Sequence, residues 1–249
     1  MDTFFDQSYN LRYFEMNKHG MASPTTILTL LEETAAEHCH NIGYNLYNLE
    51  NQNIGWVLIS GIIDMIRYPK YKENITIRTW LSKYSLVKGY RENIIFDGEG
   101  NEIGKAKGIW VFYDIQKRKP VPIFDDIKSG WGFKQETSIE LDLELIKKTD
   151  DGSFTTEFDV FRSDVDSNKH VNNIRYFHFL LETLPEEILD KYFLKTINAK
   201  FFSEAKLGEK IKVYINDNMG TNKYLHTMKS CSNDNILVKG YSQWEKMEC

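Results

Sequence analysis

Three polar side chains of complementary chemistry alternate in the second half of the sequence. Asp166, Asn168 and His170 stand two residues apart within residues 165–173, which read VDSNKHVNN. In an extended backbone, residues two apart point to the same face, so the three side chains would converge. A carboxylate, an amide and an imidazole on one face could position and deprotonate a water molecule that attacks an activated carbonyl group. The pattern predicts a hydrolytic site, although an Asp- and Asn-rich turn before a helix is also typical of simple capping.

A helix is expected directly after this motif. Residues 171–184 are mostly apolar and end before Pro185. The first backbone N–H groups of a helix have no partner inside it, and the positive end of the helix dipole lies there. Such groups can bind a substrate carbonyl oxygen and the oxyanion that forms from it. Asn172 and Asn173, at the predicted helix start, are therefore candidate substrate-binding residues.

Part of the motif is present twice, which indicates a duplicated domain. The triplet Asn-Lys-His stands at 17–19 and again at 168–170, an offset of 151. The triplet Leu-Leu-Glu stands at 30–32 and again at 180–182, an offset of 150. Two copies this far apart do not make a solenoid, whose repeats are much shorter. In this alignment Glu15 takes the place of Asp166, so the two copies have diverged.

Both halves predict the same order of elements: a strand, a helix, and then strands rich in β-branched and aromatic residues. Ser23 and Pro24 are typical of the cap and first residue of a helix, which we expect at 24–40. The predicted strands are 5–14, 56–68, 74–83, 90–96 and 102–113 in the first half, and 154–162, 195–202, 210–216, 224–230 and 236–244 in the second. This order is that of a hotdog domain, an antiparallel sheet wrapped around a long central helix. The predicted fold class is α+β, a tandem double hotdog.

The two predicted domains are joined by a segment rich in proline and glycine. Pro120, Pro122, Gly130 and Gly132 fall within it. We therefore expect an N-terminal hotdog domain at 1–115, an interdomain linker at 116–150 and a C-terminal hotdog domain at 151–249.

Composition limits the class of protein. The 249 residues are 41% hydrophobic, enough to build cores, and no apolar run reaches about 18 residues, so we expect no membrane span. A net charge of −5 with mixed signs argues against a nucleic-acid binder. The N-terminus has no base before Arg12, unlike a secretory signal or a transit peptide. Three widely spaced cysteines, an odd number, indicate reduced thiols, and the predicted location is cytoplasmic.

The second-half motif resembles the signature of the acyl-acyl-carrier-protein thioesterase family of plants and bacteria. In that signature an Arg precedes Asp-x-Asn-x-His-Val-Asn-Asn, and a Tyr follows three residues later. The resemblance spans roughly residues 5–245 and implies two tandem hotdog domains with the catalytic site in the second. The matching residues are Arg162, Asp166, Asn168, His170, Val171, Asn172, Asn173 and Tyr176.

The resemblance adds a second carboxylate to the candidate site. The family carries a Glu followed by a Cys on the next strand, and here the pair is Glu204 and Ala205. A mechanism with a catalytic Cys is therefore excluded at this position, and no covalent intermediate is required. Glu204 and His170 would position and deprotonate water, and Asn168 would bind the oxyanion. Asp166 would orient its neighbours or would itself be the base; neither a metal nor a cofactor is expected.

The resemblance also implies the substrate and the partner. A fatty acyl-acyl-carrier-protein thioester would be hydrolysed to free fatty acid and holo acyl carrier protein, a step of fatty acid biosynthesis. The acyl chain would occupy an apolar slot of the first domain, between residues 24–40 and 56–66. Candidate lining residues are Ile27, Leu31, Thr34, Trp56, Leu58, Ile62 and Ile63.

Acyl carrier protein is acidic, so a basic surface patch would attract it. Three clusters are candidates, at 67–72, 83–91 and 117–119. A homodimer is an open alternative to a monomer. Other open alternatives are an acyl-coenzyme A thioesterase, a hotdog enoyl-thioester hydratase or dehydratase, and a non-catalytic acyl-binding module. Preferred chain length is not predicted.

Overall fold

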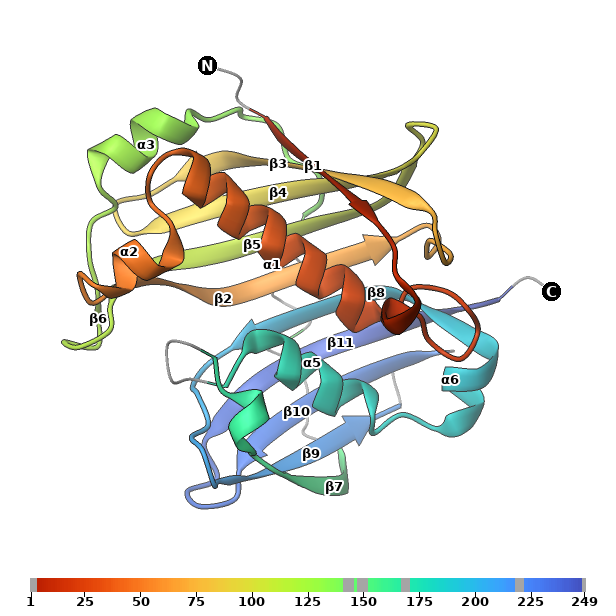
Figure 1. Ribbon diagram of the computed structural model, residues 1–249. Coiled ribbons are helices and arrows are strands. Elements are labelled where there is room, and N and C mark those ends of the chain that lie inside the picture. Colours follow the sequence, from red (N-terminus) through yellow and green to blue (C-terminus); the bar gives the residue numbers. More distant parts are fainter. Residues whose placement is uncertain (1–3, 141–145, 147–151, 167–170, 218–221, 248–249) are drawn as a thin grey trace. The chain divides into compact units, whose positions relative to one another are not determined.

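The computed structural model describes residues 4–140, 146, 152–166, 171–217 and 222–247 (Figure 1). The chain divides into two units, Met1–Glu140 and Leu141–Cys249. Within the described ranges, no helix is both long enough and apolar enough to cross a membrane.

The first unit is an antiparallel sheet with one long helix across it. Its elements are β1 (Phe5–Asn10), the 3-10 turn η1 (Tyr13–Glu15), α1 (Pro24–Asn41), α2 (Leu46–Glu50), β2 (Ile54–Met65), β3 (Asn74–Tyr84), β4 (Lys88–Asp97), β5 (Glu102–Asp114), β6 (Lys119–Pro120) and α3 (Asp125–Trp131). Along the sheet the order is β1, β3, β4, β5, β2, with β6 beside β5. α1 lies across one face of this sheet (Figure 1).

The predicted cap and first turn of α1 are confirmed. The Ser23 hydroxyl accepts a hydrogen bond of 3.0 Å from the backbone N–H of Thr26, and Pro24 is the first helical residue. Apolar and small side chains recur every three or four residues, so one side of the helix packs on the sheet. The Tyr9 hydroxyl, on β1, forms a hydrogen bond of 2.9 Å with Thr34. The buried residues of α1 are Ile27, Leu30, Thr34, His38 and Cys39.

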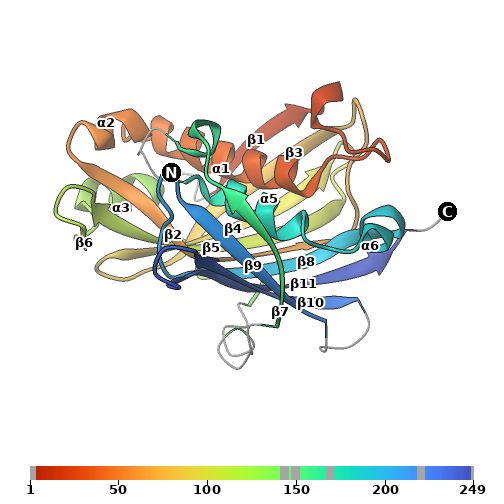
Figure 2. The same ribbon diagram turned by 90° about the horizontal axis from the view of Figure 1, so that it is seen from below.

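The second unit repeats this arrangement with shorter helices. Its elements are β7 (Ser153–Asp159), the 3-10 turn η2 (Arg162–Asp164), α5 (Asn173–Leu181), α6 (Glu186–Lys191), β8 (Tyr192–Phe201), β9 (Lys210–Asn216), β10 (Lys223–Ser230) and β11 (Ile236–Lys246). Along the sheet the order is β7, β9, β10, β11, β8, which matches the first unit strand for strand. Figure 2 shows α5 on one face of these strands. The predicted α+β hotdog fold is confirmed for each unit.

The first part of the segment that we expected to be a linker packs into the first unit. Ile123, Ile127 and Trp131 are buried in one cluster with Leu49 and Phe112. The two units divide between residues 140 and 141. Pro120 and Pro122 therefore precede a short helix, α3, whose apolar side chains complete a core.

Candidate active site

A buried carboxylate fixes the chain just before the motif. Asp164 ends η2 and is 1% exposed. It accepts hydrogen bonds from the backbone N–H of Phe161 (2.8 Å) and from the guanidinium of Arg175 (2.6 Å). Because Arg175 belongs to α5, this ion pair ties the connection after β7 to the first turn of the helix. A buried carboxylate is tolerated when it is paired and hydrogen-bonded in this way.

The ends of the motif are held together by an isolated β-bridge between Val165 and Val171. Asp166 follows the first of these and is half-buried. Asn168 and His170, the other two predicted catalytic residues, lie outside the described residues. The described part of the motif leads directly into the N-terminus of α5.

The two asparagines at the start of α5 have different surroundings. Asn172 is the N-cap, and its side-chain oxygen accepts a hydrogen bond of 2.8 Å from the backbone N–H of Ile174. Its own N–H donates to the carbonyl of Asp164 (2.9 Å). Asn173 is the first helical residue and is half-buried. Asn172 therefore has its side-chain oxygen engaged by the helix, so its NH2 group is the part that could donate to a substrate.

Glu204 follows β8 and lies near the first turn of α5. The backbone N–H of Ala205 donates a hydrogen bond of 2.8 Å to the hydroxyl of Tyr176, which is 2% exposed. Burial raises the pKa of the Tyr176 hydroxyl, the Ala205 N–H opposes this shift, and the negative charge of Glu204 adds to it. Glu204 directly precedes Ala205, so its backbone lies beside the Tyr176 hydroxyl.

Ala205 stands at the position where the family has a Cys, and neither of the described cysteines supplies a reactive thiol in its place. Cys39 is buried in the first unit, and burial raises the pKa of its thiol to about 11. Burial also raises the pKa of the Cys231 thiol. Because the thiolate is the nucleophilic form, both thiols are poor nucleophiles at neutral pH.

The same backbone pattern surrounds the first copy of the motif. Glu15 accepts a hydrogen bond from the backbone N–H three residues before it (2.7 Å), as Asp164 does in the second unit (2.8 Å). The Met16–Ala22 bridge corresponds to the Val165–Val171 bridge. These matches align the two copies with an offset of 149 residues. Glu15 is thus the counterpart of Asp164, which corrects the sequence alignment that set Glu15 against Asp166.

Asn17 is the counterpart of Asp166 in this alignment. Its side-chain oxygen accepts hydrogen bonds from the backbone N–H groups of His19 (2.9 Å) and Met21 (3.2 Å). Counting along the chain, Met21 stands where the second copy has His170. The first copy therefore has an amide in place of the carboxylate and a thioether in place of the imidazole.

The segments after β2 and β8 correspond as well. The first two residues after β2 both donate to the carbonyl of Ile103, and the first two after β8 both donate to that of Leu237. The third residue is Tyr68 in the first unit and Glu204 in the second. Tyr68 is 6% exposed, and burial raises the pKa of its hydroxyl. The second carboxylate of the candidate site thus also has an uncharged counterpart.

The predicted lining residues that belong to β2 divide between the two faces of that strand. Ile63 lies in the same cross-strand row as Thr79. The Thr79 hydroxyl accepts a hydrogen bond (3.1 Å) from Arg91, which also contacts His38 of α1, so this face is turned toward the helix. Ile62 is next to Ile63 in the strand and points to the opposite face. Its place in a slot between α1 and β2 is therefore not supported by the geometry.

The other lining candidates are compatible with a slot beside α1. Ile27 is 1% and Leu58 9% exposed, and Leu31 is half-buried. Trp56 packs against Trp131 with ring centroids 5.7 Å apart. The indole N–H of Trp56 is buried without a hydrogen-bond partner in the part of the chain that the structure describes. Such a donor is usually satisfied by water or by a polar ligand atom.

A groove that the sequence did not predict lies between β1 and the N-terminal half of α1. It encloses about 720 Å³ and is lined by hydroxyl side chains such as those of Ser23, Thr25 and Thr26, with Leu30 and charged residues around them. Its walls mix hydroxyl and charged groups with apolar surface, which distinguishes it from the wholly apolar slot that an acyl chain requires.

Arg91 is buried, which corrects its assignment to a basic surface cluster. It is 6% exposed, and its guanidinium lies 3.1 Å from Nδ1 of His38. The guanidinium carbon also lies 5.0 Å from the ring centroid of Trp131, in a cation–π contact. Burial lowers the pKa of Arg91. Burial and the charge of Arg91 lower the pKa of His38 to about 3, so the imidazole is neutral and accepts the hydrogen bond.

Comparison with known proteins extends over both units. The family description "Acyl-ACP thioesterase N-terminal domain" matches residues 2–131, and "Acyl-ACP thioesterase C-terminal domain" matches residues 147–246. Among curated relatives, oleoyl-acyl carrier protein thioesterase 2 of Arabidopsis thaliana is 24% identical over 283 aligned residues, covering 97% of this chain and 77% of the relative.

Solved structures share the fold along the whole chain. An acyl-ACP thioesterase from Bacteroides thetaiotaomicron has a TM-score of 0.87 at 21% identity, with 98% of each chain covered. The 12:0-ACP thioesterase from Umbellularia californica has a TM-score of 0.85 at 15% identity, with 99% of each chain covered. With both family descriptions matched in order, the chain belongs to the acyl-ACP thioesterase family and is a thioester hydrolase that acts on acyl-ACP.

Proposed function

We propose that the second unit carries the chemistry, with Glu204 and His170 activating the water that attacks the thioester carbonyl. The observation that supports this most is the meeting of two segments at the first turn of α5. The motif enters the helix through Asp164 and Asn172, and the segment that follows β8 is bound to the same turn through Ala205. A carboxylate on the second segment and an imidazole on the first could then share one water molecule.

The proposed reaction needs no covalent intermediate. Water loses a proton to the Glu204–His170 pair as its oxygen bonds to the carbonyl carbon, and the carbonyl oxygen becomes an oxyanion. Asn168 and the backbone N–H of Asn173 stabilise that oxyanion, since the N–H groups of Asn172, Ile174 and Arg175 donate within the turn. The tetrahedral intermediate then expels the pantetheine thiolate, which takes up the proton, and the free fatty acid is released.

We assign Asp166 an orienting role. Its counterpart Asn17 accepts hydrogen bonds from two N–H groups of its own loop. A side chain used in this way sets the shape of the loop and does not face the substrate. The alternative, in which Asp166 is itself the base, predicts that Asp166→Asn abolishes turnover, whereas an orienting role predicts partial activity.

For the acyl chain we propose the face of the first unit that is turned toward α1. Leu31, Trp56, Leu58 and Ile63 are the lining residues that the geometry favours, and Ile27 closes the slot from the helix. Ile62 is left out because it points to the other face of β2. Bulky side chains at the end of the slot would limit chain length.

We propose that acyl carrier protein docks on the surface formed by Tyr13, Phe14, Lys70, Tyr71 and Lys72. The two phenol rings contact each other edge to face at 6.2 Å, and Phe14 is 97% exposed. Both lysines are exposed, and neither forms an ion pair among the described residues. Exposed aromatic rings beside unpaired cations suit a partner that is acidic and has an apolar spot.

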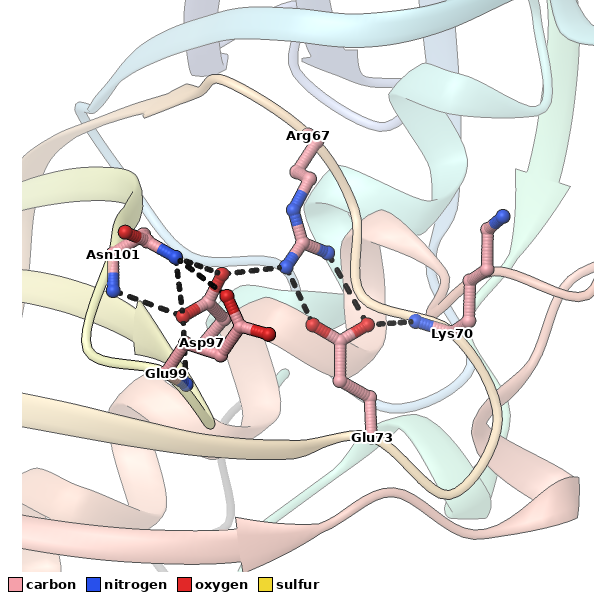
Figure 3. Close-up of polar contacts among 6 residues, drawn as sticks. All are labelled: Arg67, Lys70, Glu73, Asp97, Glu99 and Asn101. Carbon is pink, nitrogen blue, oxygen red and sulfur yellow. Dashed lines mark hydrogen bonds and ion pairs between the residues drawn. The ribbon is translucent and has the colours of Figure 1, made fainter.

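Arg67 is excluded from this docking surface by its own ion pairs. Its guanidinium lies 2.6 Å from Glu73 and 2.9 Å from Asp97, and Figure 3 shows the Lys70 ammonium pointing away from both carboxylates.

Charge reversal of Lys70 and Lys72 should raise KM for acyl-ACP and leave the KM for a short pantetheine thioester unaffected. The matched control is the same reversal at Lys83 and Lys88; a larger effect there would move the docking surface.

A cytoplasmic location and the oligomeric state are further proposals. The two described cysteines, Cys39 and Cys231, are both free thiols, which favours a reducing compartment. β1 and β7 each pair with one strand among the described residues, so an open sheet edge is available to a second copy. Light scattering after size-exclusion chromatography would distinguish a monomer from a homodimer.

The test of the proposed function is steady-state hydrolysis of acyl-ACP thioesters from C4 to C18 beside the matching coenzyme A esters. We expect a preference for the carrier protein, a maximum at one chain length, and loss of activity in Glu204→Ala. Equal rates with coenzyme A esters would favour an acyl-coenzyme A thioesterase. Hydration of enoyl thioesters without hydrolysis would instead favour a hydratase.

A further inference from the structure

The hydrogen bond between Tyr176 and Ala205 has no counterpart in the first unit. It bears on Glu204, the residue before Ala205. Tyr176 is the fourth residue of α5, and Ala205 is the fourth residue after β8. Their bond of 2.8 Å joins a hydroxyl and a backbone N–H that are both buried. It therefore connects the first turn of the helix to the backbone that carries Glu204.

The first unit has neither partner of this hydrogen bond. The fourth residue of α1 is Ile27, which has no hydroxyl, and the fourth residue after β2 is Pro69, which has no N–H. The backbone that follows is alike in the two units, since the backbone N–H groups of Lys70 and Lys206 each donate to a Glu carboxylate three residues later, at 2.9 and 3.1 Å. The bond is thus not a requirement of the fold, because the same fold forms without it.

The hydrogen bond occurs in the unit that has an acidic residue directly before the N–H donor position. Where the bond is present the preceding residue is Glu204, and where it is absent the preceding residue is the buried Tyr68. A hydrogen bond to the next residue's N–H fixes the peptide plane between Glu204 and Ala205, and with it the direction in which the carboxylate leaves the chain. The ring of Tyr176 is itself held, since it packs edge-on against Phe201 of β8 at 6.0 Å.

We propose that Tyr176 is a positioning residue for the reaction: its hydroxyl holds the backbone of Ala205 so that the Glu204 carboxylate is aimed at the water to be activated. In this role the hydroxyl acts through Glu204. This inference rests on the role of Glu204 in the proposed function.

The test combines Tyr176→Phe with Glu204→Gln. The phenylalanine keeps the ring and removes only the hydroxyl. We expect kcat for acyl-ACP to fall by about 10- to 100-fold with KM within about twofold, because a shift of about 1 Å in a reacting group can cost as much as about 100-fold in rate. In the Glu204→Gln background the same change should lower kcat by less than about threefold, since two residues that act as a unit are not additive.

Two further variants separate positioning from stability. Ala205→Pro removes the N–H in place of the hydroxyl, at a position where the first unit already has proline, and should reproduce the loss of kcat. Thr183→Val removes another buried hydroxyl of the second unit, which donates to the Leu180 carbonyl (2.7 Å), and should leave kcat unchanged. Thermal unfolding of each variant reports any common loss of stability.

The outcomes are distinguishable. The inference is overturned if Tyr176→Phe keeps a normal kcat, or if it loses the same factor with Glu204 present and with Gln in its place. A normal kcat in Glu204→Gln alone would instead overturn the proposed function.

Discussion

The two units have nearly the same backbone hydrogen bonds around the start of the helix and different side chains at the positions of the chemistry. Asp166 corresponds to Asn17, and Glu204 to Tyr68. In both units the turn before the helix is closed by a carboxylate that accepts a bond from an N–H three residues earlier. The carboxylate that shapes the turn therefore belongs to the fold, whereas the carboxylates at the positions of Asp166 and Glu204 are specific to one unit.

The two carboxylates that close the turns, Asp164 and Glu15, differ in burial, which predicts the largest difference in stability. Asp164 is 1% exposed, whereas the exposed side-chain fractions of Glu15 and its partner Arg12 are 13% and 79%. Removing Asp164 takes away the hydrogen bonds that its buried carboxylate accepts from the Phe161 N–H and from Arg175, whose side chain is 37% exposed, while an exposed pair contributes little. We expect Asp164→Ala to lower the free energy of unfolding by about 2 kcal/mol and Glu15→Ala by less than about 1 kcal/mol. Urea unfolding of the two variants measures this; equal losses would contradict the distinction.

Among the described residues, each unit also contains one buried neutral histidine, which predicts a loss of stability in acid. Burial lowers the pKa of His226 to about 3, and burial with Arg91 does the same for His38. Between that value and the ordinary pKa near 6.5, the unfolded chain binds the proton and the folded chain does not. Stability is therefore present above about pH 6.5 and falls as the pH drops, by about 1.4 kcal/mol per pH unit for each histidine.

The two histidines can be separated by substitution. His226→Leu should make the dependence of unfolding free energy on pH between 4 and 6 shallower by about one proton, and His38→Leu should do so independently. Unfolding followed at several pH values would show this. An unchanged slope in both variants would mean that other groups cause the acid sensitivity.

The smallest expected effect concerns an ion-pair cluster found in the first unit. Arg67 bridges Glu73 and Asp97, and its counterpart in the second unit is Ser203 (Figure 3). Because the Arg67 side chain is 41% exposed, we expect Arg67→Ala to cost less than about 1 kcal/mol, and less still at high salt. A loss that is large and independent of salt would show that the cluster is a structural requirement of this unit.

The strands and the first helix could be predicted from the sequence because their signals are local. β9 begins and ends at the expected residues, and Ser23 and Pro24 mark the start of α1 correctly. Short helices were less predictable. α3 follows two prolines that indicated a linker, and α6 follows Pro185, where a helix was expected only to end.

The correspondence between the two units could not be read correctly from the sequence. The triplet Asn-Lys-His repeats with an offset of 151, while the β-bridges and backbone hydrogen bonds repeat with an offset of 149. Three identical residues in a polar loop carry little structural constraint, whereas a bridge depends on residues that are distant in the sequence. The same reason hid the bond between Tyr176 and Ala205, which are 29 residues apart. Glu204 itself was found only through the family resemblance.

The role of Glu204 is tested by the kcat of Glu204→Gln on acyl-ACP, measured beside Tyr68→Phe at the corresponding position of the first unit. If the second unit alone carries the chemistry, Glu204→Gln should lower kcat by about 100-fold or more, the usual contribution of a general base, with KM nearly unchanged. Tyr68→Phe should keep kcat within about twofold. A Glu204→Gln enzyme with near-normal kcat would show that Glu204 of the second unit does not activate the water.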